Sequence, residues 1–238
     1  MRIPTAIVLT VLAVLIAACS PPDGNGFTTD PNGPVLSGQV IGYDGAEPAR
    51  VLALWPADPN ETFASGDLQL NPPRVSATLI RPDRVRASLL TALEPCETLN
   101  VTPTDLRVTS FRWLDVQGAQ NLIGQLALAE RESAEAVTVG DVSYTYLLAS
   151  SDGRITGSCG GSDDGIVVLS DEAPFSETRF DVDLVQGWNV LAVRVDALTA
   201  DEPRQPLITT TRSAAPATGA AWYFLPYLAT HGAAGPGR

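Results

Sequence analysis

The sequence contains no lysine, and all 15 of its basic residues are arginine. Lysine forms Schiff bases with carbonyl substrates and holds phosphates in Walker-type loops, so both kinds of chemistry are excluded. Histidine is nearly absent as well, because the single one, His231, lies in a Gly- and Ala-rich C-terminal tail. A core without histidine excludes His-based catalytic triads and multi-histidine metal sites. We therefore predict no catalytic residue, no metal site and no bound cofactor.

Charge is also scarce, since charged residues make up 18% of the chain and hydrophobic residues 45%. Such a chain has enough apolar surface to bury a core, which excludes extensive disorder. The charges are mostly negative, with 27 Asp and Glu against 15 Arg and a net charge of −12. Without a basic patch to displace counterions from phosphates, nucleic acid is excluded as a partner.

The N-terminal segment has the pattern of a signal peptide. Arg2 precedes an uncharged and mostly apolar run, and the small residues Ala17 and Ala18 stand just before Cys19. The run is too short to span a membrane, which takes roughly 20 apolar residues. An ordinary secretory signal, or a membrane anchor that happens to contain a cysteine, is the alternative interpretation.

The residues Leu15-Ile16-Ala17-Ala18-Cys19 resemble the lipobox of bacterial lipoproteins. This resemblance implies that residues 1–18 are removed and that Cys19 receives fatty chains such as palmitate. It also implies a cell-envelope location, with the protein lipid-anchored to the outer face of a bacterial membrane, and the outer membrane is one candidate. The expected partners are the membrane, through the lipid anchor, and an unidentified protein or glycan.

Once Cys19 carries lipid, two cysteines remain, Cys96 and Cys159. An even number of cysteines in an exported protein predicts a disulfide between them. Two free buried thiols are the alternative interpretation.

The chain after the predicted signal peptide divides into segments of different composition. Residues 20–34 are rich in Pro, Gly, Asn and Asp, so the lipidated cysteine and this stretch form a predicted flexible tether, 19–34. From Val35, short apolar and β-branched runs are interrupted about every 8 to 12 residues, which predicts an all-β domain over 35–228. We expect a two-layer antiparallel β-sandwich of about ten to twelve short strands and a disordered tail, 229–238.

Two hairpins are predicted within this domain. An Asp-Gly turn signal separates Val35–Tyr43 from Arg50–Trp55. Asp181–Val185 and Asn189–Val195 alternate with a period of two on either side of a Gln-Gly turn.

Two further resemblances support an exported β protein. Leu36–Val40, Gly45 and Pro48–Leu54 resemble the first hairpin of the carboxypeptidase regulatory-like, transthyretin-like β-sandwiches, which implies that fold. A larger part of the chain is similar to uncharacterised bacterial exported lipoproteins, a resemblance that implies no activity. The shared features are Cys96 before Val101-Thr102-Pro103, Ser158-Cys159, Gly187-Trp188-Asn189 and Trp222-Tyr223-Phe224.

Several acidic residues are candidates for a calcium site or a catalytic carboxylate pair. Asp163 and Asp164 lie in a Gly-rich loop and are candidates for calcium binding, but a solvated loop is favoured because no further ligands surround them. Asp181 and Asp183 are expected on the solvent face of a strand. No pattern in the sequence places two carboxylates at the separation that glycoside hydrolysis requires.

The four tryptophans are candidates for a sugar-binding face. They lie in or beside apolar strands, so packing in the core is the favoured interpretation. They are Trp55, Trp113, Trp188 and Trp222.

The sequence therefore predicts a membrane-anchored envelope lipoprotein with a non-enzymatic structural or binding role. A carbohydrate- or protein-binding module and a hydrolase that uses acidic residues remain as alternatives.

Overall fold

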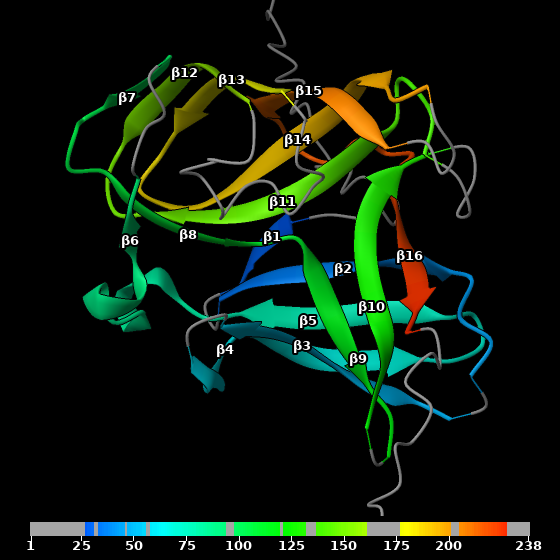
Figure 1. Cartoon of the computed structure of the whole chain (residues 1–238). Helices are drawn as coiled ribbons and strands as arrows, with labels where there is room; N and C mark the ends of the chain where they lie inside the picture. Colours follow the sequence, from blue (N-terminus) through cyan, green and yellow to red (C-terminus); the bar gives the residue numbers. More distant parts are fainter. Residues whose placement is uncertain are drawn as a thin grey trace, which may run out of the picture.

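The computed structural model shows an all-β protein of sixteen strands with two short 3-10 helices, η1 (Pro82–Arg84) and η2 (Ala87–Leu89). The all-β prediction is confirmed. Figure 1 shows two parts, a barrel and a second, curved sheet above it. The structure describes residues 27–30, 33–45, 47–55, 58–93, 98–119, 121–131, 137–160, 177–200 and 205–227.

Seven strands close into the barrel, in the order β2-β5-β4-β3-β9-β10-β16 and back to β2. The parallel pair of β16 with β2 makes the closure, with Trp222 opposite Val40. Closure removes free edges that would otherwise pair with other chains. The barrel strands are β2 (Gly33–Ile41), β3 (Ala49–Trp55), β4 (Asp58–Gln69), β5 (Arg74–Leu79), β9 (Trp113–Gln117), β10 (Leu122–Glu130) and β16 (Ala221–Pro226).

Eight strands form the second sheet, in the order β6-β8-β11-β14-β15-β13-β12-β7. It joins the barrel where β10 pairs with β11, at Ala129 opposite Ser143 and Glu130 opposite Val142. The strands are β6 (Thr91–Ala92), β7 (Leu99–Thr102), β8 (Arg107–Phe111), β11 (Val142–Ala149), β12 (Gly153–Gly160), β13 (Glu177–Leu184), β14 (Gly187–Leu198) and β15 (Pro206–Ser213).

This architecture differs from the predicted two-layer sandwich of ten to twelve strands. Apolar alternation indicates that one face of a strand is buried, but it does not indicate whether the sheet closes on itself. The predicted tether is also shorter than expected, because Phe27–Asp30 form β1 and pair with Gly33–Leu36 of β2. The predicted signal peptide, Cys19 and the tail 229–238 lie outside the described residues.

The first predicted hairpin is wrong, because β2 and β3 do not pair. The consecutive strands β3, β4 and β5 form antiparallel neighbours, and β5 then pairs with β2, for example at Val75 opposite Gly38. The spatial order β2-β5-β4-β3 is a Greek key, in which the first strand lies beside the last. The expected transthyretin-like hairpin is therefore absent.

The second predicted hairpin is also wrong, since β15 lies between β13 and β14, parallel to β13 and antiparallel to β14. Side-chain hydrogen bonds, those of Asn189 among them, hold the turn between them instead of a strand ladder. The Val185 N–H donates to Asn189 Oδ1 (2.9 Å), and Asn189 Nδ2 donates to the Val185 carbonyl (2.8 Å). Because Asn189 satisfies these backbone groups, the two strands can spread apart and admit a third.

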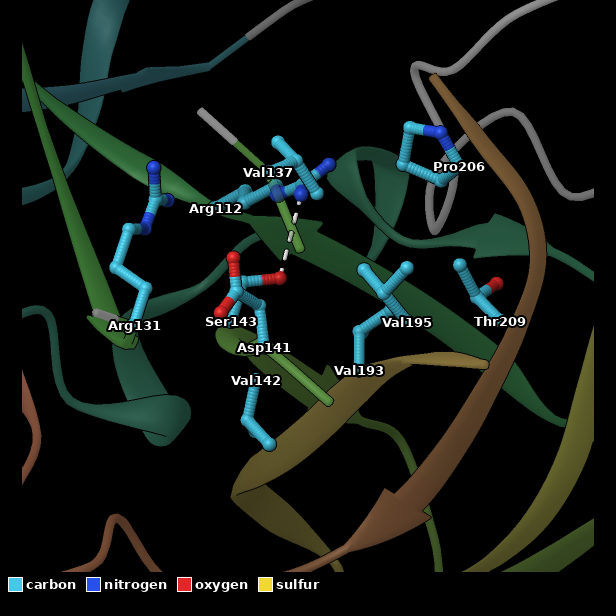
Figure 2. A pocket seen from close by; sticks show the side chains of 10 residues that line it. All are labelled: Arg112, Arg131, Val137, Asp141, Val142, Ser143, Val193, Val195, Pro206 and Thr209. Carbon is cyan, nitrogen blue, oxygen red and sulfur yellow. Dashed lines mark hydrogen bonds between the residues drawn. The ribbon is translucent and has the colours of Figure 1, made fainter. Parts of the chain in front are cut away.

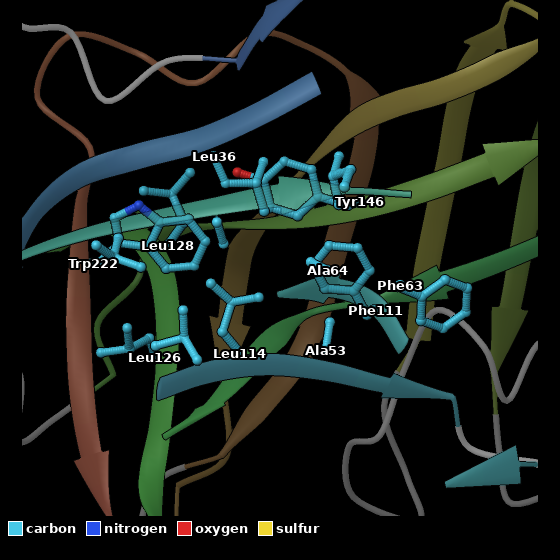
Figure 3. Close-up of a cluster of buried hydrophobic side chains, with 14 of the residues drawn as sticks. Leu36, Ala53, Phe63, Ala64, Phe111, Leu114, Leu126, Leu128, Tyr146 and Trp222 are labelled. Carbon is cyan, nitrogen blue, oxygen red and sulfur yellow. The ribbon is translucent and has the colours of Figure 1, made fainter. Parts of the chain in front are cut away.

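Two hydrophobic cores meet at β11. Tyr144, Tyr146 and Leu148 belong to the core that fills the barrel, whereas Leu147 and Ala149 belong to the core of the second sheet. β11 is buried on both faces from Tyr144 to Ala149, although Ser143 and Thr145 interrupt its apolar residues. Figure 3 shows the barrel core, where the Tyr146 ring stacks 6.4 Å from that of Trp222.

Candidate binding recess on the second sheet

Two arginines lie where the chain passes between the barrel and the second sheet. Arg112 separates β8 from β9, and Arg131 follows the last residue of β10. The Arg112 guanidinium lies 5.2 Å from the Trp113 ring, and that of Arg131 lies 5.1 Å from the Tyr223 ring. Contact with aromatic faces favours a fixed orientation of each guanidinium. Two oriented positive charges are therefore held at this corner of an acidic protein.

Arg112 faces the second sheet as well as Trp113. Its Nη2 donates to Ser143 Oγ (3.2 Å), which lies in β11. Figure 2 shows this bond at the edge of a recess whose centre is occupied by Val193 and Val195 of β14. The lining residues are Arg112, Arg131, Val137, Asp141, Val142, Ser143, Val193, Val195, Pro206 and Thr209.

The recess encloses about 370 Å³ of empty space, part of which is open to solvent. Only about 40 Å³ of it can hold the centre of a water molecule. Since one water needs roughly 10–15 Å³ by this measure, the enclosed part takes a few waters or one small polar group. A larger ligand would place one group inside and its body in the open part.

Among the residues that the structure describes, Asp141 is the one carboxylate that lines the recess. Both of its oxygens accept hydrogen bonds from Thr138, one from the backbone N–H and one from the hydroxyl, each at 2.8 Å. These bonds close a turn just before β11 in the way that Asp side chains commonly do. The charged side chains lining the recess are thus two arginines and one structurally engaged aspartate.

The sheet face that floors the recess carries several hydroxyl groups. Ser143 is opposite Val193, and Val193 is opposite Thr211, so the three share this face. In the neighbouring row Thr209 donates from its hydroxyl to that of Thr178 (3.1 Å).

Two hydroxyl groups of this face have no hydrogen-bond partner, those of Thr145 and Thr211. Their residues are 2% and 1% exposed, so water does not satisfy them. An unsatisfied buried hydroxyl costs roughly 1–3 kcal/mol. Folding alone gives no reason to keep threonine in place of valine at these positions.

The predicted disulfide lies partly within the described residues. Cys159 is 6% exposed and faces the core of the second sheet. Cys96 lies outside the described residues, so the pairing stays a prediction. The segment just after Cys96 does lie beside Cys159, because the Thr98 hydroxyl donates to the Ser158 carbonyl.

The candidate acidic residues do not gather around the recess. Asp181 and Asp183 are exposed, as predicted, and both bind Arg154, at 2.9 and 2.6 Å. Asp163 and Asp164 lie outside the described residues. Among the residues that the structure describes, no group of three or more His, Cys, Asp or Glu is placed to hold a metal ion.

Two tryptophans pack in the core, as predicted. Trp222 is 1% exposed inside the barrel, and Trp188 is 8% exposed and donates from Nε1 to the Ile80 carbonyl (2.9 Å). Trp113 is half-buried beneath Arg112. The side chain of Trp55 lies outside the described part of the structure.

Sequence reasoning missed the residues of the recess. Arg112 gave the clearest signal, because it interrupts an apolar strand between Phe111 and Trp113. The run of three threonines at 209–211 gave a second signal, because three consecutive hydroxyl residues in a strand place at least one hydroxyl on the buried face.

No described segment forms a helix with the length and hydropathy needed to cross a membrane. Comparisons of the chain with known protein families, with curated proteins and with solved structures found no match.

Proposed function

We propose that this chain is a lipid-anchored binding protein of the bacterial cell envelope. The recess lined by Arg112, Arg131, Ser143 and Thr209 receives the ligand and leaves it chemically unchanged. One observation carries the binding role: two guanidiniums, each held against an aromatic ring, line a recess together with the hydroxyl-bearing residues Ser143 and Thr209.

Two hydroxyls on the same sheet face, near the recess although not among its lining residues, give a second and weaker support. Thr145 and Thr211 keep unpaired hydroxyls at a cost to folding, although valine has the same shape and no polar atom. Residues that cost stability without packing better are commonly retained at functional sites. The two arginines add donors in a planar fork, which suits the recognition of an oxyanion.

A hydrolase is the weaker alternative. Acid–base hydrolysis of a glycoside needs two carboxylates across a cleft, whereas the described lining of the recess contains one, Asp141. Asp115, a carboxylate outside the recess, has structural partners: it accepts from the Tyr227 hydroxyl (2.9 Å) and from Gln125 Nε2 (3.1 Å).

The anchoring part of the proposal rests on the lipobox-like residues that end at Cys19. Cells grown with a labelled fatty acid test it. We expect label on the parent protein and on a Cys96→Ala/Cys159→Ala variant, but none on Cys19→Ala. Equal labelling of Cys19→Ala and the parent would refute the anchor.

The proposal includes a disulfide between Cys96 and Cys159. It would tie the chain that leads into β7 to the neighbouring strand β12, where Thr98 already bonds the carbonyl beside Cys159. Alkylation followed by mass spectrometry should modify neither cysteine until reductant is added. Modification of both in unreduced protein would exclude the bond.

An array of glycans and peptides, probed with the full-length protein in detergent, tests the binding role. We expect retention of at least one class of anionic compound, with loss on Arg112→Gln. Arg212→Gln is the matched control, because Arg212 is exposed on the opposite face of the same sheet and should bind as the parent does. Binding that survives Arg112→Gln unchanged would exclude the recess.

A further inference from the structure

A second hollow, the connector cleft, lies at the end of β11 opposite to the recess. It is lined by the connector, residues 81–90, by the chain where β11 ends and by the turn into β14. None of its described lining residues lines the recess. About 420 Å³ of the cleft can hold the centres of water molecules, against about 40 Å³ in the recess. Pockets of roughly 300–1,000 Å³ are of the size that buries most of a small organic ligand.

The connector is held at both of its ends. Before it, the Ile80 N–H donates to the Phe63 carbonyl (2.7 Å), and the Ile80 carbonyl accepts from Trp188 Nε1 (2.9 Å). After it, Thr91 pairs with Val108 in the second sheet. Figure 1 shows the two short helices of the connector to one side of the strands, below β6. Since protein interiors leave few voids larger than a water molecule, a hollow of this size beneath a fixed connector favours a binding site.

The floor of the connector cleft is apolar. It consists of Leu148 and Ala149, each 2% exposed, which belong to the two hydrophobic cores that meet at β11. Pro82 and Leu90 line the cleft from the connector, and Leu90 also packs on the barrel core. An apolar molecule of matching size would therefore bury surface here, which favours its binding.

Hydrogen-bond acceptors border this apolar floor. Gln186 is oriented by its Nε2, which donates to the Ser150 carbonyl (3.1 Å), so its Oε1 is left as an acceptor. Asp83 accepts one hydrogen bond on each carboxylate oxygen, from Arg81 Nε (3.0 Å) and Nη2 (3.1 Å). Since a carboxylate offers about four acceptor positions, Asp83 can accept further bonds. A protonated amine suits this border, because it has three donors and a positive charge that the carboxylate attracts.

We infer that the connector cleft binds a primary amine with a compact apolar body, such as a ring or a branched alkyl group. The ammonium group lies at Asp83 and Gln186, and the apolar body covers Leu148 and Ala149. This second site is independent of the recess and of the anionic ligand proposed there.

Titration calorimetry of the full-length protein in detergent tests the inference with four probes: cyclohexylmethylamine, cyclohexylmethanol, cyclohexanecarboxylate and methylamine. The first three share an apolar ring and differ in its polar group, whereas methylamine has the amine without the ring. Heats measured in protein-free detergent are subtracted. We expect saturable binding of cyclohexylmethylamine, with the other three at least about fivefold weaker, since one hydrogen bond or a buried ring accounts for a factor of that size.

Two variants at the border of the cleft should act in opposite directions. Asp83→Asn should weaken the binding of cyclohexylmethylamine by about fivefold, whereas Arg81→Gln, which removes a competing cation, should strengthen it by about twofold. Asp181→Asn is the matched control, because Asp181 is also an exposed aspartate paired with an arginine, Arg154 (2.9 Å), and does not line the cleft. Exposed ion pairs contribute little to stability, so all three variants should fold, which urea unfolding checks.

Each failure has its own reading. Binding of cyclohexylmethanol or cyclohexanecarboxylate as tight as that of cyclohexylmethylamine would overturn the role of the ammonium group. Weakening by Arg81→Gln as large as that by Asp83→Asn would overturn Asp83 as the partner of the amine. No binding of cyclohexylmethylamine would overturn the inference as a whole and would leave the proposed function of the recess, which the array tests, unaffected.

Discussion

The interior of the barrel and one face of the second sheet bury their side chains in contrasting ways. This face, here named the concave face, carries Ser143, Leu191, Val193 and Thr211. The barrel is closed and filled by aliphatic and aromatic residues, among them Phe63, Phe111 and Trp222. The concave face is apolar around Leu191 and hydroxyl-lined around Thr211. On our proposal, the barrel is the scaffold and the second sheet carries the binding site, a common division in binding proteins.

The largest difference should appear on truncating an apolar side chain in each part. Phe63 is fully buried and packs on Phe111 and Trp188, so Phe63→Ala should lower the free energy of unfolding by about 3–5 kcal/mol. Val193→Ala, at the half-buried floor of the recess, should lower it by less than about 2 kcal/mol. Urea unfolding measures both, and equal losses would contradict a scaffold confined to the barrel.

Two glycines sharpen the same contrast. A Cβ on Gly66 would lie 1.9 Å from the Ser76 carbonyl oxygen and 2.5 Å from Ala77 Cα, both backbone atoms of the neighbouring barrel strand. Gly66→Ala should therefore lower the free energy of unfolding by about 3 kcal/mol. Gly140 (φ +99°) has open space around it, so Gly140→Ala should lower the free energy of unfolding by only about 1 kcal/mol, because of backbone strain. Urea unfolding with equal losses would contradict this ranking.

The junction between the two parts should be sensitive to alkaline pH. Burial, with the hydrogen bond that the Tyr144 hydroxyl donates to Glu130, raises the pKa of Tyr144 to about 12. Below pH 10 both folded and unfolded states keep this proton, and between pH 10 and 12 the unfolded state loses it first. Stability should therefore fall across that interval.

Denaturant unfolding at pH 9 and pH 11 checks whether the free energy of unfolding falls as the pH rises. Tyr144→Phe should lose less stability than the parent over this interval. Tyr227→Phe is a useful comparison, because burial and Asp115 also raise the pKa of Tyr227 to about 12, on the outside of the barrel. An identical fall in the parent and in both variants would show that neither tyrosine is responsible.

The smallest expected changes in stability concern two threonines of the concave face, Thr209 and Thr211. Thr209→Val would leave Thr178 without its partner and should lower the free energy of unfolding by about 1 kcal/mol. Thr211→Val removes a hydroxyl that has no partner and should leave stability unchanged or raise it by up to about 1 kcal/mol. A loss at Thr211 as large as that at Thr209 would show that its hydroxyl is needed for folding.

The positions of many strands were predictable, but their partners were not. Alternation placed β13 correctly, because its residues alternate regularly between buried and exposed, and it also placed β14, whose burial is less regular. Nothing local indicated that β15 would lie between them, since pairing between distant strands depends on the whole fold. The Gly-rich strand β12 was missed because glycine weakens the signal of a strand.

The site was less predictable than the fold. Arg112, Ser143 and Thr209 lie far apart in the sequence, and they meet because β8, β11, β14 and β15 belong to one sheet. The motifs that the sequence did offer, at Cys19, Cys96 and Asp163, lie outside the described residues.

Hydrogen exchange of backbone amides, with and without an anionic compound that the array retains, tests the proposed separation of scaffold and binding site most directly. The account predicts slower exchange in β11, β14 and β15, around Ser143, Val193 and Thr209, with barrel strands β3, β4 and β5 unchanged. Slowing that appears equally in the barrel, or no slowing around the recess at a saturating concentration of that compound, would contradict it.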